Sequence, residues 1–303
     1  MPRIIRKLRG AGIVGRDVNK PDRPEVAEMG GLGVFLGFNV GVFAFLVLAG
    51  PAAPEPALVL VALITAAGAT MTGILDDLVV LRQRFKAFIP VVFAAPLAVY
   101  VDDYSVWLPF AGSVDFGLLY PLVLVPLGVT CASNGFNMLE GYNGLGAGIG
   151  VVLAVGLAVV CWIAGAPTGL VLLLPLLGGL LAFLRFNWHP AKVFPGDTMT
   201  LLVGAVLAAA AILSKVEFWG LLLFLPHVVE FAIKMRNGFP SKGWWGEFRG
   251  GKLHCPPNGP VGLGQWTMRV AGGITERRLV ATMLAAEAAV AAIVVGLAAV
   301  VGA

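Results

Sequence analysis

Charged residues are scarce in this sequence. They make up 13% of its 303 residues, against 58% hydrophobic residues, and the mean hydropathy is +0.90. This scarcity excludes a soluble globular protein, which could not bury so much apolar surface. A helix that spans a bilayer needs about 20 apolar residues, and runs of that length recur from Gly31 to the C-terminus. We therefore predict one integral membrane domain over residues 1–303.

Cysteines are also few. Cys131, Cys161 and Cys255 are an odd number and lie in apolar runs or in a loop, which argues against a disulfide framework. The basic start leads into a polar stretch over residues 17–28 and not into an apolar core, so we expect no secretory signal peptide. The N-terminus is expected in the cytoplasm.

The apolar runs predict an all-α bundle of transmembrane helices, with about nine spans. The predicted spans cover residues 31–50, 57–75, 87–101, 115–132, 146–165, 168–185, 198–214, 217–235 and 279–302. On this topology every Lys and Arg except Lys215 falls on the cytoplasmic side, as the positive-inside rule requires. The net charge of +4 is thus explained by sidedness, and we expect no nucleic-acid partner.

Most of the unusual polar residues fall in loops on that same side. These loops cover residues 15–24, 75–86, 134–144, 187–198 and 240–266. Their convergence on one membrane face predicts an active site at the cytoplasmic surface. The last loop is part of a longer cytoplasmic segment, residues 236–278, which is rich in Gly, Pro and Trp and is predicted to form a lid or a short membrane-lying element.

Three acids point to a cation site. Asp76 and Asp77 end one predicted span, where adjacent acids often merely mark the water interface. Asp197 begins another span after Gly196, and carboxylates from two helices form an oxygen cage for a hard cation. Magnesium is the natural choice beside substrate phosphates, with manganese as the alternative.

Amides and a lysine accompany these acids. Asn134 and Asn137 share a helix face if their segment is helical, while Asn143 precedes a glycine and could equally shape a turn. Lys86 follows the acid pair and offers positive charge to a pyrophosphate. Phe194 could stack on a planar ring, although aromatic residues in such runs more often pack. His254, alone in its loop, is more often merely solvated.

Taken together, these motifs resemble the polyprenyl-phosphate N-acetylhexosamine-1-phosphate transferases. The resemblance runs from about Asp17 to Gln265 and is strongest over residues 17–30, 73–86, 134–144 and 187–198. The Asn-Gly-Phe-Asn-Met-Leu-Glu-Gly-Tyr-Asn-Gly and Phe-Pro-Gly-Asp-Thr segments are most similar to the eukaryotic and archaeal UDP-GlcNAc:dolichyl-phosphate GlcNAc-1-phosphate transferases. The bacterial peptidoglycan branch is more distant.

The resemblance implies a reaction in which GlcNAc-1-phosphate passes from UDP-GlcNAc to a polyprenyl or dolichyl phosphate, with release of UMP. Asn137 and Asp197 would hold the metal. Asp76, Asp77 and Lys86 would belong to the catalytic centre. The residues expected to bind the substrates are Glu28, Asn134, Asn143, Phe194, Arg249 and His254.

Two departures from the family pattern bear on these expectations. The usual His/Arg-rich motif of the last cytoplasmic loop is replaced by residues 253–258, which leaves Arg249, Lys252 and His254 as substitutes. The family commonly has ten spans, and the first 16 residues here are too short and too basic to supply another.

Two alternatives stay open. A related transferase could use another UDP-sugar such as UDP-MurNAc-pentapeptide, and the altered last loop is where the two would differ. A transporter of an anionic metabolite would carry ionisable residues near mid-membrane, whereas the acids here cluster at helix ends. Within the membrane lipid, the protein could form a homodimer.

Overall fold

The computed structural model describes residues 1–79, 81–240 and 242–302. Its helices are α1 (Pro2–Gly10), α2 (Gly31–Ala49), α3 (Pro56–Val79), α4 (Gln83–Tyr100), α5 (Val125–Leu139), α6 (Leu145–Ile163), α7 (Pro167–Asn187), α8 (Asp197–Leu213), α9 (Glu217–Leu223), α10 (Leu225–Arg236), α11 (Leu263–Val270) and α12 (Glu276–Val301). A 3₁₀ turn (Gly50–Ala52) and a π-helical turn (Tyr120–Leu124) adjoin α2 and α5.

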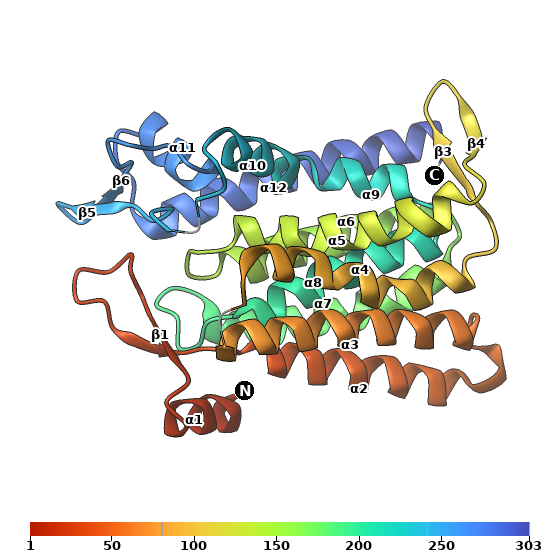
Figure 1. Cartoon of the computed structure of the whole chain (residues 1–303), viewed down its shortest axis with the longest axis horizontal. Coiled ribbons are helices and arrows are strands. Elements are labelled where there is room, and N and C mark those ends of the chain that lie inside the picture. The colour runs from red at the N-terminus through yellow and green to blue at the C-terminus, as the bar shows by residue number, and fades with distance from the viewer. Residues whose placement is uncertain (80, 241, 303) are drawn as a thin grey trace.

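Within the described ranges, three antiparallel hairpins join these helices. They are β1 (Val14–Arg16) with β2 (Glu25–Ala27), β3 (Ser105–Leu108) with β4 (Gly112–Asp115), and β5 (Glu247–Arg249) with β6 (Lys252–His254). The long helices run side by side, with β3–β4 at one end of the bundle and α1, β1 and β5–β6 at the other (Figure 1). The end that carries α1 is also where the polar loops gather, and we call it the polar end.

The prediction of an all-α transmembrane bundle is confirmed. Six helices in the described ranges are long and apolar enough to cross a membrane, and the bent pair α9–α10 would make a seventh crossing. The apolar α8 has only 17 residues, and α4 has 18 and carries Arg84 and Lys86 in its first turn. Every predicted span falls largely on a helix, while the number nine stays a prediction.

Two predicted spans differ from the structure in detail. The span placed at 115–132 begins in strand β4, and the helix itself starts at Tyr120 and continues to Leu139. The span placed at 217–235 is broken, because α9 and α10 meet at an angle of 60°. Pro226 stands at the start of α10, where its missing N–H and its ring prevent α9 from continuing straight.

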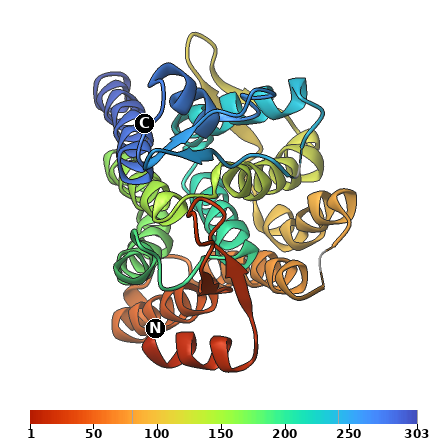
Figure 2. The ribbon, with the colours of Figure 1, turned by 90° about the vertical axis from the view of Figure 1, so that its left-hand side faces the viewer.

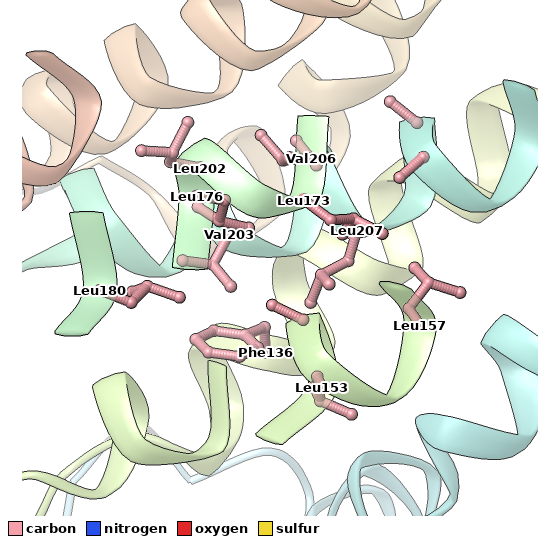
Figure 3. Packing of buried hydrophobic residues seen from close by; sticks show 14 of the residues in the cluster. Phe136, Leu153, Leu157, Leu173, Leu176, Leu180, Leu202, Val203, Val206 and Leu207 are labelled. Carbon is pink, nitrogen blue, oxygen red and sulfur yellow. The ribbon is translucent and has the colours of Figure 1, made fainter. Parts of the chain in front are cut away.

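Helix α8 forms the centre of the bundle. It packs against α3, α5 and α7, and its side chains are buried along almost its whole length. Phe136 of α5 and Leu176 of α7 lie beside its Val203 (Figure 3). This burial explains how a short helix is accommodated, since it needs no lipid-facing surface of its own. Its first residue, Asp197, lies at the polar end.

At the polar end, segments from all parts of the sequence meet. Viewed from that end, the first loop, the loops around residues 140 and 190 and the segment before α12 lie across the ends of the helices (Figure 2). Helix α1 lies beside them with Leu8 buried and its basic side chains exposed. The convergence of polar loops predicted from the sequence is therefore present in the fold.

Candidate active site

A large cavity opens at the polar end and extends into the bundle. Its volume is about 1550 Å³. The polar part of its wall includes Asp17, Glu28, Asp77, Lys86, Asn134, Asn137, Asn143 and Asp197, with the aromatic Phe194 among them. The remainder is largely apolar and follows α5, α8, α9 and α10 toward β3, with Leu157, Leu207 and Phe224 among its residues. One continuous space therefore offers both a charged and a hydrocarbon-like environment.

Lys86 connects two of the predicted acids. Its Nζ donates to Asp76 Oδ2 at 2.8 Å and also to Asp197 Oδ2. The lysine is 7% exposed, so an unpaired ammonium would be costly there, and the two carboxylates compensate it. Asp76 itself lies behind the lysine and also accepts from the backbone N–H of Leu81 at 2.7 Å. The ion pairs hold a positive charge at the cavity wall.

Asp77 has a different task from its neighbour. Its two carboxylate oxygens accept from the backbone N–H of Asp197 at 2.8 Å and from Thr198, whose N–H and hydroxyl lie at 3.1 and 2.6 Å. A carboxylate in this position caps the start of α8 and satisfies N–H groups that have no partner within the helix. Asp77 therefore fixes where the Asp197 carboxylate enters the cavity.

Two glycines make this cap sterically feasible. A Cβ at Gly196, whose φ is +67°, would lie 2.4 Å from Asp77 Oδ2. A Cβ at Gly73, one turn earlier on α3, would lie 2.4 Å from the Asp197 carbonyl carbon. The backbone of α3 thus approaches the start of α8 more closely than any side chain would permit.

Asn137 and Asp197 form the pair that could hold a metal. Asn137 Nδ2 donates to Asp197 Oδ1 and to Thr200 Oγ1, both at 2.7 Å. Within residues 1–79, 81–240 and 242–302, no group of three or more His, Cys, Asp or Glu is arranged for metal binding. One carboxylate and one amide oxygen match Mg²⁺, which keeps water and shares substrate phosphates.

Asn143 belongs to a buried polar network. Its Nδ2 donates to Asp17 Oδ2 at 2.9 Å and to Glu276 Oε1 at 2.8 Å, and its Oδ1 accepts from the Ala191 N–H at 2.6 Å. Lys20 pairs with both Asp17 and Glu276. Four segments distant in sequence are joined here. In this structure both polar atoms of the Asn143 side chain already bond to protein groups. A base in the cavity would therefore contact the surface around this network and not the amide itself.

Glu28 and Glu140, which lie on the cavity wall outside the membrane-spanning helices, have raised pKa values. Burial, and then the nearby charge of Asp77, raises the pKa of Glu28 above its usual value. Glu140 lies on the wall between Asn137 and Asn143, and burial followed by the charges of Glu28, Glu276 and Asp77 raises its pKa to about 8. The cavity end thus holds more acid than base, which favours a cationic or metal-bound ligand.

Phe194 and Asn134 complete the predicted residues on this wall. Phe194 and Glu28 both lie beside Gly15, where a Cβ would lie 3.2 Å from the Phe194 ring and 3.0 Å from Glu28 Oε2. Asn134 Nδ2 donates to the carbonyls of Ala87 at 3.2 Å and Thr130 at 2.9 Å. It therefore ties α5 to α4 next to Lys86.

Arg249 and His254 do not lie on the cavity wall that the structure describes. Arg249 is exposed at the tip of the β5–β6 hairpin and pairs with Glu247. The adjacent Leu253 bonds to Ile274 in both directions, at 2.8 and 3.0 Å, and the His254 ring packs on Gly273. This pairing fixes the hairpin away from the cavity, and the last loop presents Trp244 and Trp245 to it instead.

Several residues that shape this site carried no sequence signal. Gln265, which is 1% exposed, donates to the carbonyls of Gly243 at 2.7 Å and Trp245 at 3.0 Å and so positions the tryptophans. Glu276 joins the site from the start of α12, 133 residues after Asn143. Only tertiary contacts reveal such partners. Asp17 and Lys20 lay inside a polar loop already singled out, which was their one signal.

The fold and the cavity together define an integral membrane protein with a charged site, suited to phosphate groups, at one end of its helix bundle. The glycosyl transferase family 4 model matches residues 59–215, which include Asp76, Lys86, Asn137 and Asp197. The chain belongs to this family. The resemblance drawn from the four motifs is thereby confirmed.

Individual relatives agree with this assignment. A Saccharolobus solfataricus protein is 36% identical over 96% of this chain and 90% of its own length, and is named a putative UDP-N-acetylglucosamine–dolichyl-phosphate N-acetylglucosaminephosphotransferase. The Schizosaccharomyces pombe enzyme of that name is 33% identical over 59% of this chain and 45% of its own. A phospho-N-acetylmuramoyl-pentapeptide-transferase of Desulforamulus reducens is 34% identical over 62% of this chain and 60% of its own.

Proposed function

We propose that the protein transfers GlcNAc-1-phosphate from UDP-GlcNAc to a polyprenyl phosphate of the dolichyl type, giving GlcNAc-PP-polyprenol and UMP. The observation that carries this proposal is the cavity, whose charged end around Lys86 and Asp197 continues into an apolar groove. A nucleotide sugar needs the first environment and a polyprenyl chain needs the second. The names of the archaeal and yeast relatives supply the donor and the acceptor.

In this proposal Asn137 and Asp197 hold Mg²⁺, with Mn²⁺ as the alternative. The hard oxygen donors fit such an ion, and the ordinary coordination of Mg²⁺ leaves places for water and for the donor phosphates. When bound, the ion would neutralise charge on the pyrophosphate. Glu28, Asn143 and Phe194 shape the end of the cavity that we assign to the uridine.

The reaction requires one phosphorus–oxygen bond to form and one to break. An oxygen of the lipid phosphate attacks the phosphorus attached to the sugar, and UMP leaves from the opposite side with the electrons of the broken pyrophosphate bond. Lys86 supplies positive charge beside Asp197, where negative charge accumulates on the transferring group. A lipid phosphate is already an anion, so neither Asp76 nor Asp77 is needed as a base.

Asp76 and Asp77 then act on position. Asp76 orients Lys86, and Asp77 sets the start of α8 and thus the direction of the Asp197 side chain. We place this end of the bundle in the cytoplasm. The Lys and Arg residues gather there, while Lys215 lies near the β3–β4 hairpin at the opposite end, where it bonds to Ser105.

The donor sugar is the part of this proposal that has a rival. The D. reducens relative is named for a muramoyl-pentapeptide donor, and residues 253–258 of the last loop here differ from the usual family motif. The rival predicts UMP release with UDP-MurNAc-pentapeptide in place of UDP-GlcNAc.

The test is to incubate the purified protein in detergent with a short polyprenyl phosphate, Mg²⁺ and a panel of UDP-sugars, and to measure UMP. We expect UMP with UDP-GlcNAc, and its loss when a chelator removes the metal. Release with another donor alone would correct the sugar. No release with any donor would contradict the transferase assignment.

A further inference from the structure

His227 is a buried residue that the mechanism above does not use. It lies in the first turn of α10, directly after the 60° bend, and it is 2% exposed. Neither its Nδ1 nor its Nε2 has a hydrogen-bond partner among the described residues. The side chain nevertheless forms part of the cavity wall. An unpaired imidazole inside a membrane protein is unfavourable, and intramembrane polar residues commonly mark the path of a substrate.

Aromatic rings hold the imidazole in place. The Phe136 ring stacks on it with centroids 5.6 Å apart and an interplanar angle of 17°, and the Phe224 ring lies 4.8 Å away. These contacts fix the plane of the imidazole but use none of its hydrogen-bonding capacity. The nitrogens are therefore left for a group that enters the cavity.

The position of His227 indicates which group this is. A Cβ at Gly135 would lie 3.9 Å from the His227 Cβ, and Gly135 stands between Asn134 and Asn137 on α5. His227 is thus level with the asparagines beside Lys86 and Asp197. Its neighbours on the cavity wall, Phe224 and Val228, are apolar. The histidine marks the boundary between the charged end and the hydrocarbon groove.

We propose that His227 binds the phosphate of the lipid acceptor, donating a hydrogen bond from its imidazole to a non-bridging phosphate oxygen. A molecule with a single phosphate on a long apolar chain places that phosphate at the boundary between the two environments, where His227 lies. The nucleotide donor has no such boundary to cross, so His227 distinguishes the acceptor from the donor. This inference rests on the function proposed above.

The test compares steady-state kinetics of the wild-type protein with those of His227→Phe, which keeps the aromatic packing and removes both nitrogens. We expect the KM for polyprenyl phosphate to rise at least about tenfold, as for loss of a hydrogen bond to a charged group, while the KM for UDP-GlcNAc changes less than about twofold. His227→Gln retains a donor and should fall between the two. Equal changes in both KM values, or none, would overturn the proposal.

Two controls keep the outcomes separate. Val229→Phe adds the same ring two residues further along α10, at a position that is 42% exposed and is not on the described cavity wall, and should leave both KM values unchanged. Wild-type protein that releases no UMP would contradict the proposed function itself, whereas active wild type with unaltered His227→Phe kinetics would refute only the role of His227. If His227→Phe does not fold, His227→Gln is used instead, and a rise in the KM for polyprenyl phosphate without a matching rise in the KM for UDP-GlcNAc again supports the proposal.

Discussion

At the scale of single residues, Asp197 is the side chain on which the proposed site depends most. It faces the cavity, pairs with Lys86, and accepts a hydrogen bond from Asn137 Nδ2. Asp197→Asn keeps the shape but removes the charge, so we expect turnover to fall at least about 100-fold, with thermal unfolding within a few degrees of wild type. UMP release and a melting curve measure both.

The matched control for this substitution is Asp115→Asn. Asp115 is exposed at the opposite end of the bundle and accepts only a local bond from the Gly117 N–H at 2.8 Å among the described contacts. Its turnover should equal that of wild type. Retained activity in Asp197→Asn would remove Asp197 from the site.

Glu140 leads to a prediction about pH. Its pKa in the folded protein is raised from 4.5 to about 8, so the folded state favours the neutral carboxyl. The neutral Glu140 carboxyl contributes its full stability to the folded state below about pH 4.5, and this contribution is lost as the pH rises through about 8. Glu140→Gln stays neutral and should avoid this loss.

We therefore expect the Tm of Glu140→Gln to exceed that of wild type above about pH 8, by roughly 2–4 °C for each 1 kcal/mol, and the difference to vanish below about pH 4.5. Melting curves of metal-free protein across this range provide the measurement. A difference that does not change with pH would contradict the assigned pKa.

At the scale of elements, the helices could be predicted because their apolar runs are long enough to span a bilayer without reference to tertiary contacts. The bend between α9 and α10 had a local signal in Pro226 that a hydropathy average conceals. The β3–β4 hairpin had none, since its short strands mix polar and apolar residues. It falls in the predicted loop before the span at 115–132, and only its last residue, Asp115, overlaps that span.

The candidate site follows the same division. Asp76, Lys86, Asn137 and Asp197 stand at helix ends in compact motifs, so their convergence could be inferred from topology. The position of the last loop could not. Its course depends on the pairing of Leu253 with Ile274 and on the buried Gln265, which are contacts between residues with no mutual pattern in sequence.

The packing of α5 against α8 carries a prediction of its own. A Cβ at Gly204 of α8 would lie 2.4 Å from the Ala132 carbonyl oxygen and 2.5 Å from Ser133 Cα, so the two backbones touch. Gly204→Ala must separate them. We expect a loss of about 1–3 kcal/mol, read as a lower Tm, and reduced turnover because these helices carry Asn137 and Asp197.

Gly178→Ala is the matched control for this effect. Gly178 lies inside α7, and a Cβ there would meet nothing within 4 Å. In a helix interior the alanine should stabilise by about 0.5–1 kcal/mol. If the two substitutions change the Tm in opposite directions, the steric contact at Gly204 decides the effect and not the loss of a glycine. Changes in the same direction would contradict the close packing of α5 and α8.

At the scale of the whole molecule, the bundle has two chemically different ends. The β3–β4 hairpin is held by Lys215, which bonds to the Asp103 carbonyl at 3.0 Å. Most other basic residues belong to the end with the cavity. A membrane potential and a cytoplasmic leaflet that attracts Lys and Arg would orient such a molecule with the cavity inside.

This orientation can be measured with single cysteines. In a background without Cys131, Cys161 and Cys255, Ser113→Cys would mark the exposed β3–β4 hairpin and Arg249→Cys the exposed β5–β6 hairpin. A membrane-impermeant maleimide applied to intact cells should label Ser113→Cys only, and Arg249→Cys should react after permeabilisation. The reverse pattern would place the cavity outside the cell. UDP-GlcNAc is supplied in the cytoplasm and UMP is reused there, so this result would contradict both the topology and the proposed donor.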